Sequence, residues 1–333
     1  MEAVAQPRSL TGPAGRIKMN RTLSSPALKQ AQRLHAQAVV VVIVLGISLA
    51  IGLAALGYPP GRIELGIFAV STVLVGLGSS VGFHRHFTHR SFAATTPVRV
   101  VLAILGSMSM QGTLFFWVAL HRRHHEHSDE AGDPHSPHIR EDGSTYGSRL
   151  RGVWHSYMGW TFGHEVPNAA YYAKDLVQDK VLSRVNRLYF LWVLLGLALP
   201  TLAGGLLTRS WLGALSGLAW GGLLRIFFWH NMIWYITSLS HVIGQRDFRS
   251  GDLSTNSIWL SLPTLGESWH NNHHAFPTAP ILHLRWYQLD VSGLVIRLLS
   301  LLRLAWDLKE PTAKMLLEKA TYNNSSLNRV DSQ

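Results

Sequence analysis

The sequence predicts an all-α integral membrane protein: four transmembrane helices in two hairpins, with a cytoplasmic helical cap that holds a histidine-rich site for two metal ions. Three observations lead to this fold class. Four apolar runs are long enough to cross a bilayer, short turns join them in pairs, and histidines gather in three tight clusters beside them. A hydrophobic share of 47% over 333 residues agrees with membrane helices that carry a smaller polar domain.

The first predicted hairpin covers residues 39–58 and 63–83. The run VVVVIVLGISLAIGLAALGY at 39–58 has no charge, and its length of about 20 residues matches the ~30 Å hydrocarbon core at 1.5 Å per residue. The turn PPGR follows, and IELGIFAVSTVLVGLGSSVGF at 63–83 has a single acid near its start. So short a turn requires the two spans to cross in opposite directions.

The second predicted hairpin covers residues 189–208 and 211–229. Its runs, YFLWVLLGLALPTLAGGLLT and WLGALSGLAWGGLLRIFFW, contain one charge, Arg225, which we expect near the end of a span. Together the two hairpins give four crossings.

A fifth apolar stretch, VRVVLAILGSMSMQGTLFFWVAL at 98–120, is long enough for another crossing. Polar and small residues interrupt its middle, however: Ser107, Ser109, Gln111, Gly112 and Thr113. Hydropathy alone leaves a fifth crossing and an interfacial or buried helix about equally favoured. The positions of the histidine clusters, described below, favour the interfacial or buried helix.

Lysine and arginine beside the spans predict the orientation, because the flanks richest in them stay cytoplasmic. Residues 1–36 hold six basic residues and one acid, whereas the hairpin turns offer only Arg62 and Arg209. We therefore expect a multi-pass protein whose termini and segments 84–188 and 230–310 are cytoplasmic. The basic tail 1–36 is expected to be disordered, the membrane domain to cover 37–310, and a C-terminal tail to cover 311–333.

The chain is basic, with 30 Lys and Arg against 19 Asp and Glu. The lipid bilayer accounts for this excess, and no nucleic-acid motif occurs, so we expect a membrane partner and no nucleic acid. The absence of cysteine excludes disulfides and thiolate metal ligands.

Two histidine triplets have the same spacing. HRRHH contains His121, His124 and His125, and HNNHH repeats the pattern with His270, His273 and His274. Positions i, i+3 and i+4 share one face of an α-helix, so each triplet can direct three imidazoles into one volume. Neutral imidazole is a common ligand for iron, copper, zinc and nickel.

The third cluster, HRHFTH, places His84 and His89 five residues apart directly after the second span. On an α-helix these two positions are about 140° apart at 3.6 residues per turn, so a helix end or a turn must bring them together. Eight candidate ligands exceed the needs of one four-coordinate ion and predict two metal ions. If the clusters converge, the 98–120 stretch must return to the cytoplasmic face.

These segments resemble the membrane fatty-acid desaturase family, and within it the acyl-CoA delta-9 (stearoyl-CoA type) branch. GFHRHFTHRSF, HRRHHEHSDEAGDPHSPH and GESWHNNHHAFP are similar to its three histidine boxes, and the resemblance covers roughly residues 40 to 310. In ITSLSHVIGQRDF, His241 matches a further histidine of that branch. The family commonly has Asn where this chain has Thr237, which puts in doubt a water-mediated or outer contact to the metal.

The resemblance implies an oxygen-dependent oxidoreductase that introduces a cis double bond, at the delta-9 position, into a saturated fatty acyl chain carried by coenzyme A. Its cofactors would be two non-haem iron ions, with O2 as co-substrate. A separate electron donor would be needed, whether ferredoxin, flavoprotein reductase or cytochrome, because the short tail after residue 310 lacks cysteine for an iron–sulfur centre. The implied metal ligands are His84, His89, His121, His124, His125, His241, His270, His273 and His274.

Other residues are candidates for supporting roles. Four acidic side chains are expected to accept hydrogen bonds from ligand imidazoles, with helix capping or salt bridging as alternatives: Asp129, Asp133, Asp252 and Glu267. Tryptophans that could line an apolar slot for the acyl chain, or anchor the membrane interface, are Trp117, Trp154, Trp160, Trp229, Trp234 and Trp269. Arginines that could contact coenzyme A phosphates, or lipid headgroups, are Arg122, Arg123 and Arg151.

The remaining histidines receive other roles. His35 is expected to be solvated in the basic tail, and His86 to be structural. Surface or loop positions are expected for His135, His138, His164 and His283. An outer contact to the metal site or a substrate contact stays open for His127, His155 and His230.

Three alternative functions remain. An acyl-lipid desaturase and a fatty-acyl hydroxylase would use the same di-iron scaffold. A non-enzymatic membrane protein for metal binding or transport is the alternative from a different class, but transport favours ionisable residues inside the spans, whereas the candidate ligands lie beside them.

Overall fold

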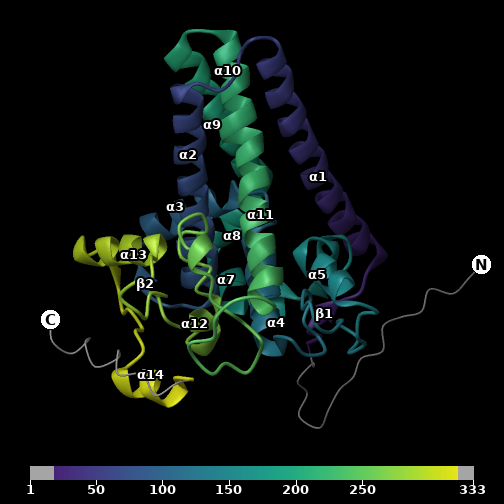
Figure 1. The fold of residues 1–333 in the computed structure, drawn as a ribbon, viewed down its shortest axis with the longest axis vertical. Coiled ribbons are helices and arrows are strands. Elements are labelled where there is room, and N and C mark those ends of the chain that lie inside the picture. The colour runs from purple at the N-terminus through teal and green to yellow at the C-terminus, as the bar shows by residue number, and fades with distance from the viewer. Residues whose placement is uncertain (1–18, 322–333) are drawn as a thin grey trace, which may run out of the picture.

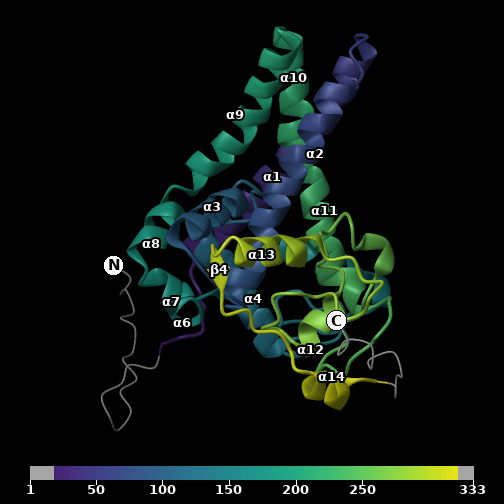
Figure 2. The same cartoon turned by 90° about the vertical axis from the view of Figure 1, so that its left-hand side faces the viewer.

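The computed structural model describes residues 19–321, which are mostly helical. Four of its helices are long and apolar enough to cross a membrane: Pro26–Ala55, Arg62–Thr88, Tyr189–Thr208 and Trp211–His241. Figures 1 and 2 show that these helices project together from one side of a cap made of short helices and loops. The predicted class, an all-α membrane protein with two hairpins and a histidine-bearing cap, is confirmed.

The four long helices are assembled from the following elements. The first is α1 (Pro26–Ala55), and the second is α2 (Arg62–Leu77) continued by the π-helix η1 (Gly78–Thr88). The third is α9 (Tyr189–Thr208), and the fourth consists of α10 (Trp211–Gly217), the π-helix η3 (Leu218–Leu224), α11 (Arg225–Ser238) and the 3₁₀ turn η4 (Leu239–His241).

Small residues let the second hairpin close tightly. A Cβ atom added at Gly204 of α9 would lie 2.1 Å from the carbonyl oxygen of Gly213 in α10, which is closer than any side chain allows. Small residues at such contacts let membrane helices approach by their backbones. Apolar side chains on the outer surfaces, such as Leu206 and Phe190, are more than 70% exposed and suit a lipid environment.

Arg225 does not lie near the end of a span, as the sequence suggested, because the fourth helix continues to His241. Its side chain is 1% exposed. The guanidinium donates hydrogen bonds to the carbonyl oxygens of Gly221, Met108 and Gly196. Those bonds tie α11 to the end of the helix that follows the second span and to α9.

The 98–120 stretch does not form a single helix of spanning length. It divides into α3 (Thr96–Ser107) and α4 (Leu114–His127), and neither has spanning length. Met110 and Gly112, between the two helices, have positive φ angles of 61° and 100°, so the chain turns sharply there. The expectation of a buried or interfacial segment agrees with this break.

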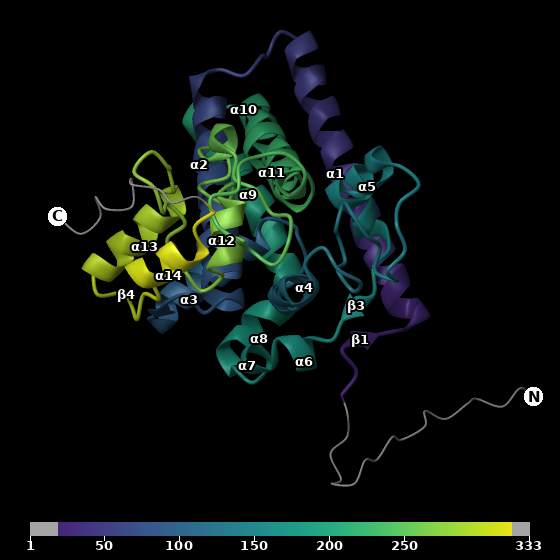
Figure 3. The same cartoon turned by 60° about the horizontal axis from the view of Figure 1, so that its bottom comes forward.

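The cap collects the remaining elements. Its short helices are α5 (Arg149–Tyr157), η2 (Gly159–Phe162), α6 (Ala169–Tyr172), α7 (Lys174–Val177), α8 (Lys180–Arg187), η5 (Ile258–Leu260), α12 (His270–Ala275), α13 (Val291–Leu301) and α14 (Ala313–Lys319). Two antiparallel pairs of two-residue strands close it: β1 (Thr22–Leu23) with β3 (Val166–Pro167), and β2 (Ala93–Ala94) with β4 (Ala305–Trp306). Figure 3 shows α4, α11 and α12 near one another at its centre.

The terminal regions differ from the expected tails. Within the tail expected over 1–36, strand β1 pairs with β3 and α1 begins at Pro26, because proline suits the first turn of a helix. Within the tail expected over 311–333, α14 forms and Ala320 pairs with Phe248. Residues 1–18 and 322–333 lie outside the described part of the chain.

Candidate metal centre

A π-helix brings His84 and His89 together. In this helix type each N–H bonds to the carbonyl five residues earlier, so residues five apart stand one turn above the other. The N–H of His89 donates to the carbonyl of His84 at 3.2 Å, and the two ring centroids are 4.9 Å apart. The two side chains therefore lie near one face of the helix, whereas an α-helix would hold them about 140° apart.

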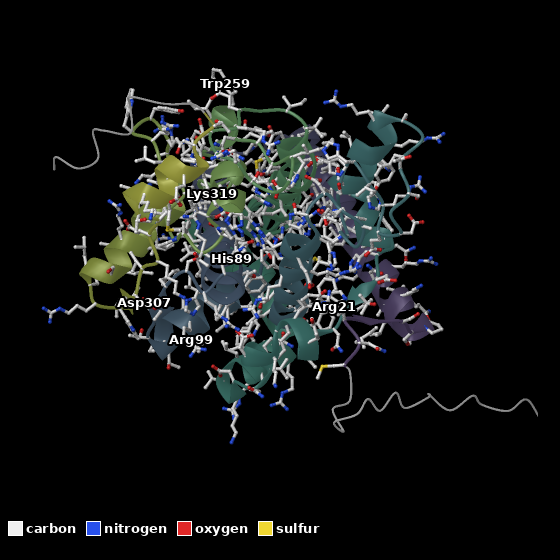
Figure 4. The ribbon with its side chains drawn as sticks, turned by 90° about the horizontal axis from the view of Figure 1, so that it is seen from below. Arg21, His89, Arg99, Trp259, Asp307 and Lys319 are labelled. Carbon is white, nitrogen blue, oxygen red and sulfur yellow. The ribbon has the colours of Figure 1, made fainter. Side chains whose placement is uncertain are left out.

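The other histidines come from three further elements. The triplet of α4 and the triplet of α12 each present three rings from one helix face, and η4 contributes His241 at the end of the fourth long helix. Figure 4, which views the cap from below, places His89 in the middle of the cap, while Arg99, Trp259 and Asp307 lie toward its rim. Segments far apart in the sequence therefore meet at one place.

The nine histidines expected to be ligands fall into two groups. In each group the ring nitrogens that could bind metal all lie within 4.8 Å of one another. The group of five contains His84, His89, His121, His125 and His273, and the group of four contains His124, His241, His270 and His274. The α4 and α12 triplets contribute to both groups, so the two groups are neighbours.

Several pairs of Nε2 atoms lie about 3 Å apart, a separation that suits either an N–H···N hydrogen bond or binding of both nitrogens to one ion. The Nε2–Nε2 distances are 3.0 Å for His84 and His273, 2.9 Å for His125 and His273, 3.1 Å for His121 and His125, and 2.9 Å for His241 and His270. Two imidazole nitrogens bound at right angles to one ion, at about 2.1 Å each, would lie about 3.0 Å apart. The spacing fits metal coordination.

Four carboxylates contact the Nδ1 atoms of four of these histidines, on the side of the ring opposite Nε2. Nδ1 of His124 lies 3.0 Å from Asp133, Nδ1 of His241 lies 2.8 Å from Asp129, and Nδ1 of His84 lies 2.5 Å from Glu267. Nδ1 of His274 pairs with Asp252. A carboxylate at Nδ1 directs the other nitrogen of the ring toward the centre of its group.

Glu267 belongs to a larger buried network that we did not anticipate from the sequence. Arg85, 1% exposed, donates to Glu267 at 3.0 Å and to Asp290 at 2.8 Å. Ser80 donates to Glu267 as well. The position of Arg85 between His84 and His86 could have indicated a role at the site. Its partners, Glu267 and Asp290, lie more than 180 residues later in the sequence, so local spacing could not identify them.

Burial sets the protonation of the site. It lowers the pKa of four rings well below 6.5, namely His121, His125, His270 and His273. Burial alone would raise the pKa of Glu267, but His84 and the Arg85 guanidinium lower it to about 2. The rings are therefore neutral and the carboxylate charged near pH 7, which is the combination that metal binding requires.

Among the buried histidine Nε2 atoms of the described residues, three have no hydrogen-bond partner: those of His89, His124 and His274. A buried polar atom without a partner costs about 1–3 kcal/mol. All three histidines belong to the two groups of ring nitrogens. In His124 and His274, the other ring nitrogen, Nδ1, contacts a carboxylate. The donor set fits metal ions with nitrogen ligands.

A largely apolar cavity of about 420 Å³ leads to these histidines. His84, His121, His124 and His270 line one end, and α1 lines the other with Leu28 and neighbouring residues. A second, more polar cleft of about 780 Å³ reaches His89, His125 and His274. The histidines are thus accessible through two openings of different character.

Three of the six tryptophans expected to contact substrate line the apolar cavity. Among the tryptophans, Trp117, Trp160 and Trp234 line the apolar cavity. The others do not: Trp154 is exposed on α5, Trp229 packs in a core cluster, and Trp269 donates to the carbonyl of Leu289.

The arginine candidates do not line the cavity either. Arg122 is bound by Asp175, and Arg123 by Glu141 and Glu165, so their charges are already neutralised. Arg151 is exposed on α5. None of the three is placed to meet a phosphate at the cavity.

The structure corrects the placement of three other histidines. His35 lies on α1 and lines the cavity, because the helix begins earlier than expected. His135 and His164 are 4% and 5% exposed and also line it. His138 and His283 are half-buried, and His138 reaches the carbonyl of His241.

The remaining polar candidates have other contacts. His86 bonds the carbonyl of Phe92, His155 that of Pro134, and His230 that of Ile226. Thr237 lines the cavity, and its hydroxyl donates to the carbonyl of Ser156 instead of to a histidine. His127 belongs to neither group of ring nitrogens.

Fold and site together define a four-helix membrane protein with a multi-histidine centre at the end of an apolar cavity. The family model described as "Fatty acid desaturase" matches residues 64–290. The chain belongs to the fatty acid desaturase family, a family of oxidoreductases. That membership favours an enzyme over the non-enzymatic metal-binding or transport alternative.

Several curated proteins are similar over most of the chain. The hex-5-enoyl-[acyl-carrier protein] acetylenase of Moorena producens is 44% identical over 91% of this chain and 94% of its own length. The sn-1 stearoyl-lipid 9-desaturase of Synechocystis sp. is 35% identical over 76% of this chain and 74% of its own. Acyl-CoA desaturase 1 of Saccharomyces cerevisiae is 34% identical over 76% of this chain and 48% of its own.

Proposed function

We propose that this chain holds two iron ions through its nine clustered histidines and uses O2 and external electrons to introduce a cis double bond into a fatty acyl chain. The observation that carries the proposal is the convergence of nine ring nitrogens, in two adjacent groups, at the end of an apolar cavity. The ligands would be the group of five for one iron and the group of four for the other.

The proposed role of each group of residues follows from its position relative to the histidines and the cavity. A saturated acyl chain has no acidic proton that a side chain could remove, so the bound irons supply the oxidising chemistry. The carboxylates Asp129, Asp133, Asp252 and Glu267 orient the imidazoles. Cavity-lining groups such as Trp117 and Trp234 hold the chain against the histidines and exclude water.

The finer details belong to the same proposal. We infer a delta-9 product, and coenzyme A as the carrier of the acyl chain. An acyl chain bound to an acyl-carrier protein is a second candidate, supported by the Moorena producens relative. A lipid-bound acyl chain is a third, supported by the Synechocystis relative.

The polar cleft beside His89 and His274 would let a separate electron donor approach the irons from a side other than the apolar cavity. Both termini and the site would face the cytoplasm.

The experiment is to purify the protein in detergent, measure its iron, and supply reductant, O2 and a stearoyl substrate on each of the three carriers. About two irons per chain and a monounsaturated product are expected. His273→Ala should remove activity with all substrates. His127→Ala, on α4 but in neither nitrogen group, is the matched control and should retain it. Full activity of iron-free protein would refute the proposal. A hydroxylated product would show that the protein is a fatty-acyl hydroxylase and not a desaturase.

A further inference from the structure

The helix α12 is only six residues long, yet it carries His270, His273 and His274. A helix shorter than about 12–15 residues is marginal in water without outside contacts. Its last four carbonyl groups have no partner within the helix. The directions of the three rings therefore depend on the contacts that other segments make with the two ends of α12.

A buried side chain fixes the first turn of α12. Asn256 is 4% exposed, and its Oδ1 accepts the backbone N–H of Asn271 at 3.0 Å and that of Asn272 at 3.2 Å. An asparagine at the start of a helix satisfies free N–H groups in this way. His270, at this end of the helix, is held without any contribution from the C-terminal helix α14.

A lysine of α14 contacts the other end of α12. Nζ of Lys319 donates to the carbonyl oxygen of Ala275, the last residue of α12, at 2.6 Å and lies 5.3 Å from the centre of the Phe276 ring. A basic group at this end satisfies a free carbonyl and suits the negative end of the helix dipole. Figures 1 and 2 show α14 beside α12, on the side of the cap away from the spans.

The backbone around Lys319 is itself anchored. The N–H of Arg249 donates to the carbonyl of Lys319 at 2.7 Å, and Ala320 pairs with Phe248. Leu316 of α14 packs against the apolar cluster that includes Phe248. These contacts bring the ammonium group to one place, at the last carbonyl of α12.

We propose that Lys319 is a positioning residue of the metal centre, which holds the last turn of α12 and thereby fixes the directions of His273 and His274. One of these rings belongs to each group of ring nitrogens. The inference rests on the proposed function, since it takes the rings as metal ligands. The competing explanation is that Lys319, an exposed residue, only adds charge to the surface. Lys314 offers a matched comparison, because it is exposed on the same helix and pairs with Glu318 instead of with α12.

The test loads full-length protein in detergent with Co²⁺, whose visible absorption reports its nitrogen ligands, and follows release of the ion to excess EDTA. Lys319→Met should release Co²⁺ about three- to tenfold faster than wild type, which is the effect of losing one hydrogen bond. Lys319→Arg should restore most of the wild-type rate, because a guanidinium can donate to the same carbonyl, and Lys314→Met should change nothing. Equal release from Lys319→Met and wild type, or equal acceleration in Lys314→Met, would overturn the proposal.

Hydrogen exchange of the metal-free protein separates this claim from the proposed function. In Lys319→Met, the amides at the end of α12 should exchange faster, while the long helices and the Tm stay as in wild type. If wild type binds no Co²⁺ but Lys319→Met shows this local change, the proposed function fails and the contact that orders α12 stands. Unchanged exchange in α12 would refute the role of Lys319 alone, and so would faster exchange throughout the protein.

Discussion

Asp252 illustrates how the centre depends on side chains that contact no metal themselves. It pairs with Nδ1 of His274, and its pKa is lowered: burial opposes the charged form, but the hydrogen bond from His274 and those from Ser254 and Ser250 outweigh burial. The carboxylate is therefore charged at neutral pH. Its role is to hold the ring so that Nε2 of His274 faces the group of four.

We expect Asp252→Asn to weaken metal binding about 10–100-fold, because an amide holds the imidazole less firmly than a carboxylate. Iron per chain, measured after dialysis against graded concentrations of a chelator, checks this. Asp142→Asn is the control, since Asp142 lies on an exposed loop and bonds only the Ser144 segment. Equal iron retention by Asp252→Asn and wild type would contradict the assigned role.

Residue types and spacing were sufficient to select eight of the nine histidines that the structure brings together, and the family resemblance added His241. Neither predicted the burial of every polar side chain. His135 and His164 looked like loop residues because hydropathy is low around them, yet the folded cap covers both. Arg122 looked available for phosphate because its partner Asp175 is more than 50 residues away. Contacts of this kind depend on tertiary structure, which local patterns do not contain.

At the scale of elements, η1 is the part of the fold that sequence periodicity could not provide. An α-helix would hold His84 and His89 apart, but the wider turns of the π-helix η1 bring them together, and η1 packs closely on α3. A Cβ added at Gly78 would lie 2.2 Å from the backbone nitrogen of Gly106. The position of η1, and of both histidines, therefore depends on glycine at this contact.

Gly78→Val should displace η1 from α3 and lower iron per chain, with a loss of stability of about 1–3 kcal/mol as in other overpacked contacts. Thermal unfolding in detergent and metal analysis would detect both effects. Gly66→Val on the same span is the control, because no atom lies within 4 Å of a Cβ placed there. A variant at Gly78 with normal iron content and stability would show that the tight contact is unimportant.

At the scale of the whole molecule, hydropathy identified the four long helices, because the length of an apolar run is a local property. It placed some ends wrongly, since α1 begins at Pro26 and the fourth helix continues to His241. The arrangement of the cap was not predictable in the same way, because it depends on pairs such as Arg85 with Asp290 and Asp129 with His241. The sequence indicates that the histidines should meet, and the tertiary fold determines how.

The proposed orientation can be tested by labelling, since the chain has no cysteine of its own. A cysteine at Leu56, 73% exposed at the far end of α1, should react with a membrane-impermeant maleimide added outside intact cells. A cysteine at Lys314, on α14 at the opposite end of the molecule in Figure 1, should react only after the cells are opened. The reverse pattern would place the cap outside the cytoplasm.

Two iron ions are expected to lie side by side within the nine histidines. Crystals of iron-loaded protein, measured on both sides of the iron absorption edge, test it most directly. Two anomalous peaks are expected, one among His84, His89, His121, His125 and His273 and the other among His124, His241, His270 and His274. A single peak, or iron bound away from these rings, would contradict it.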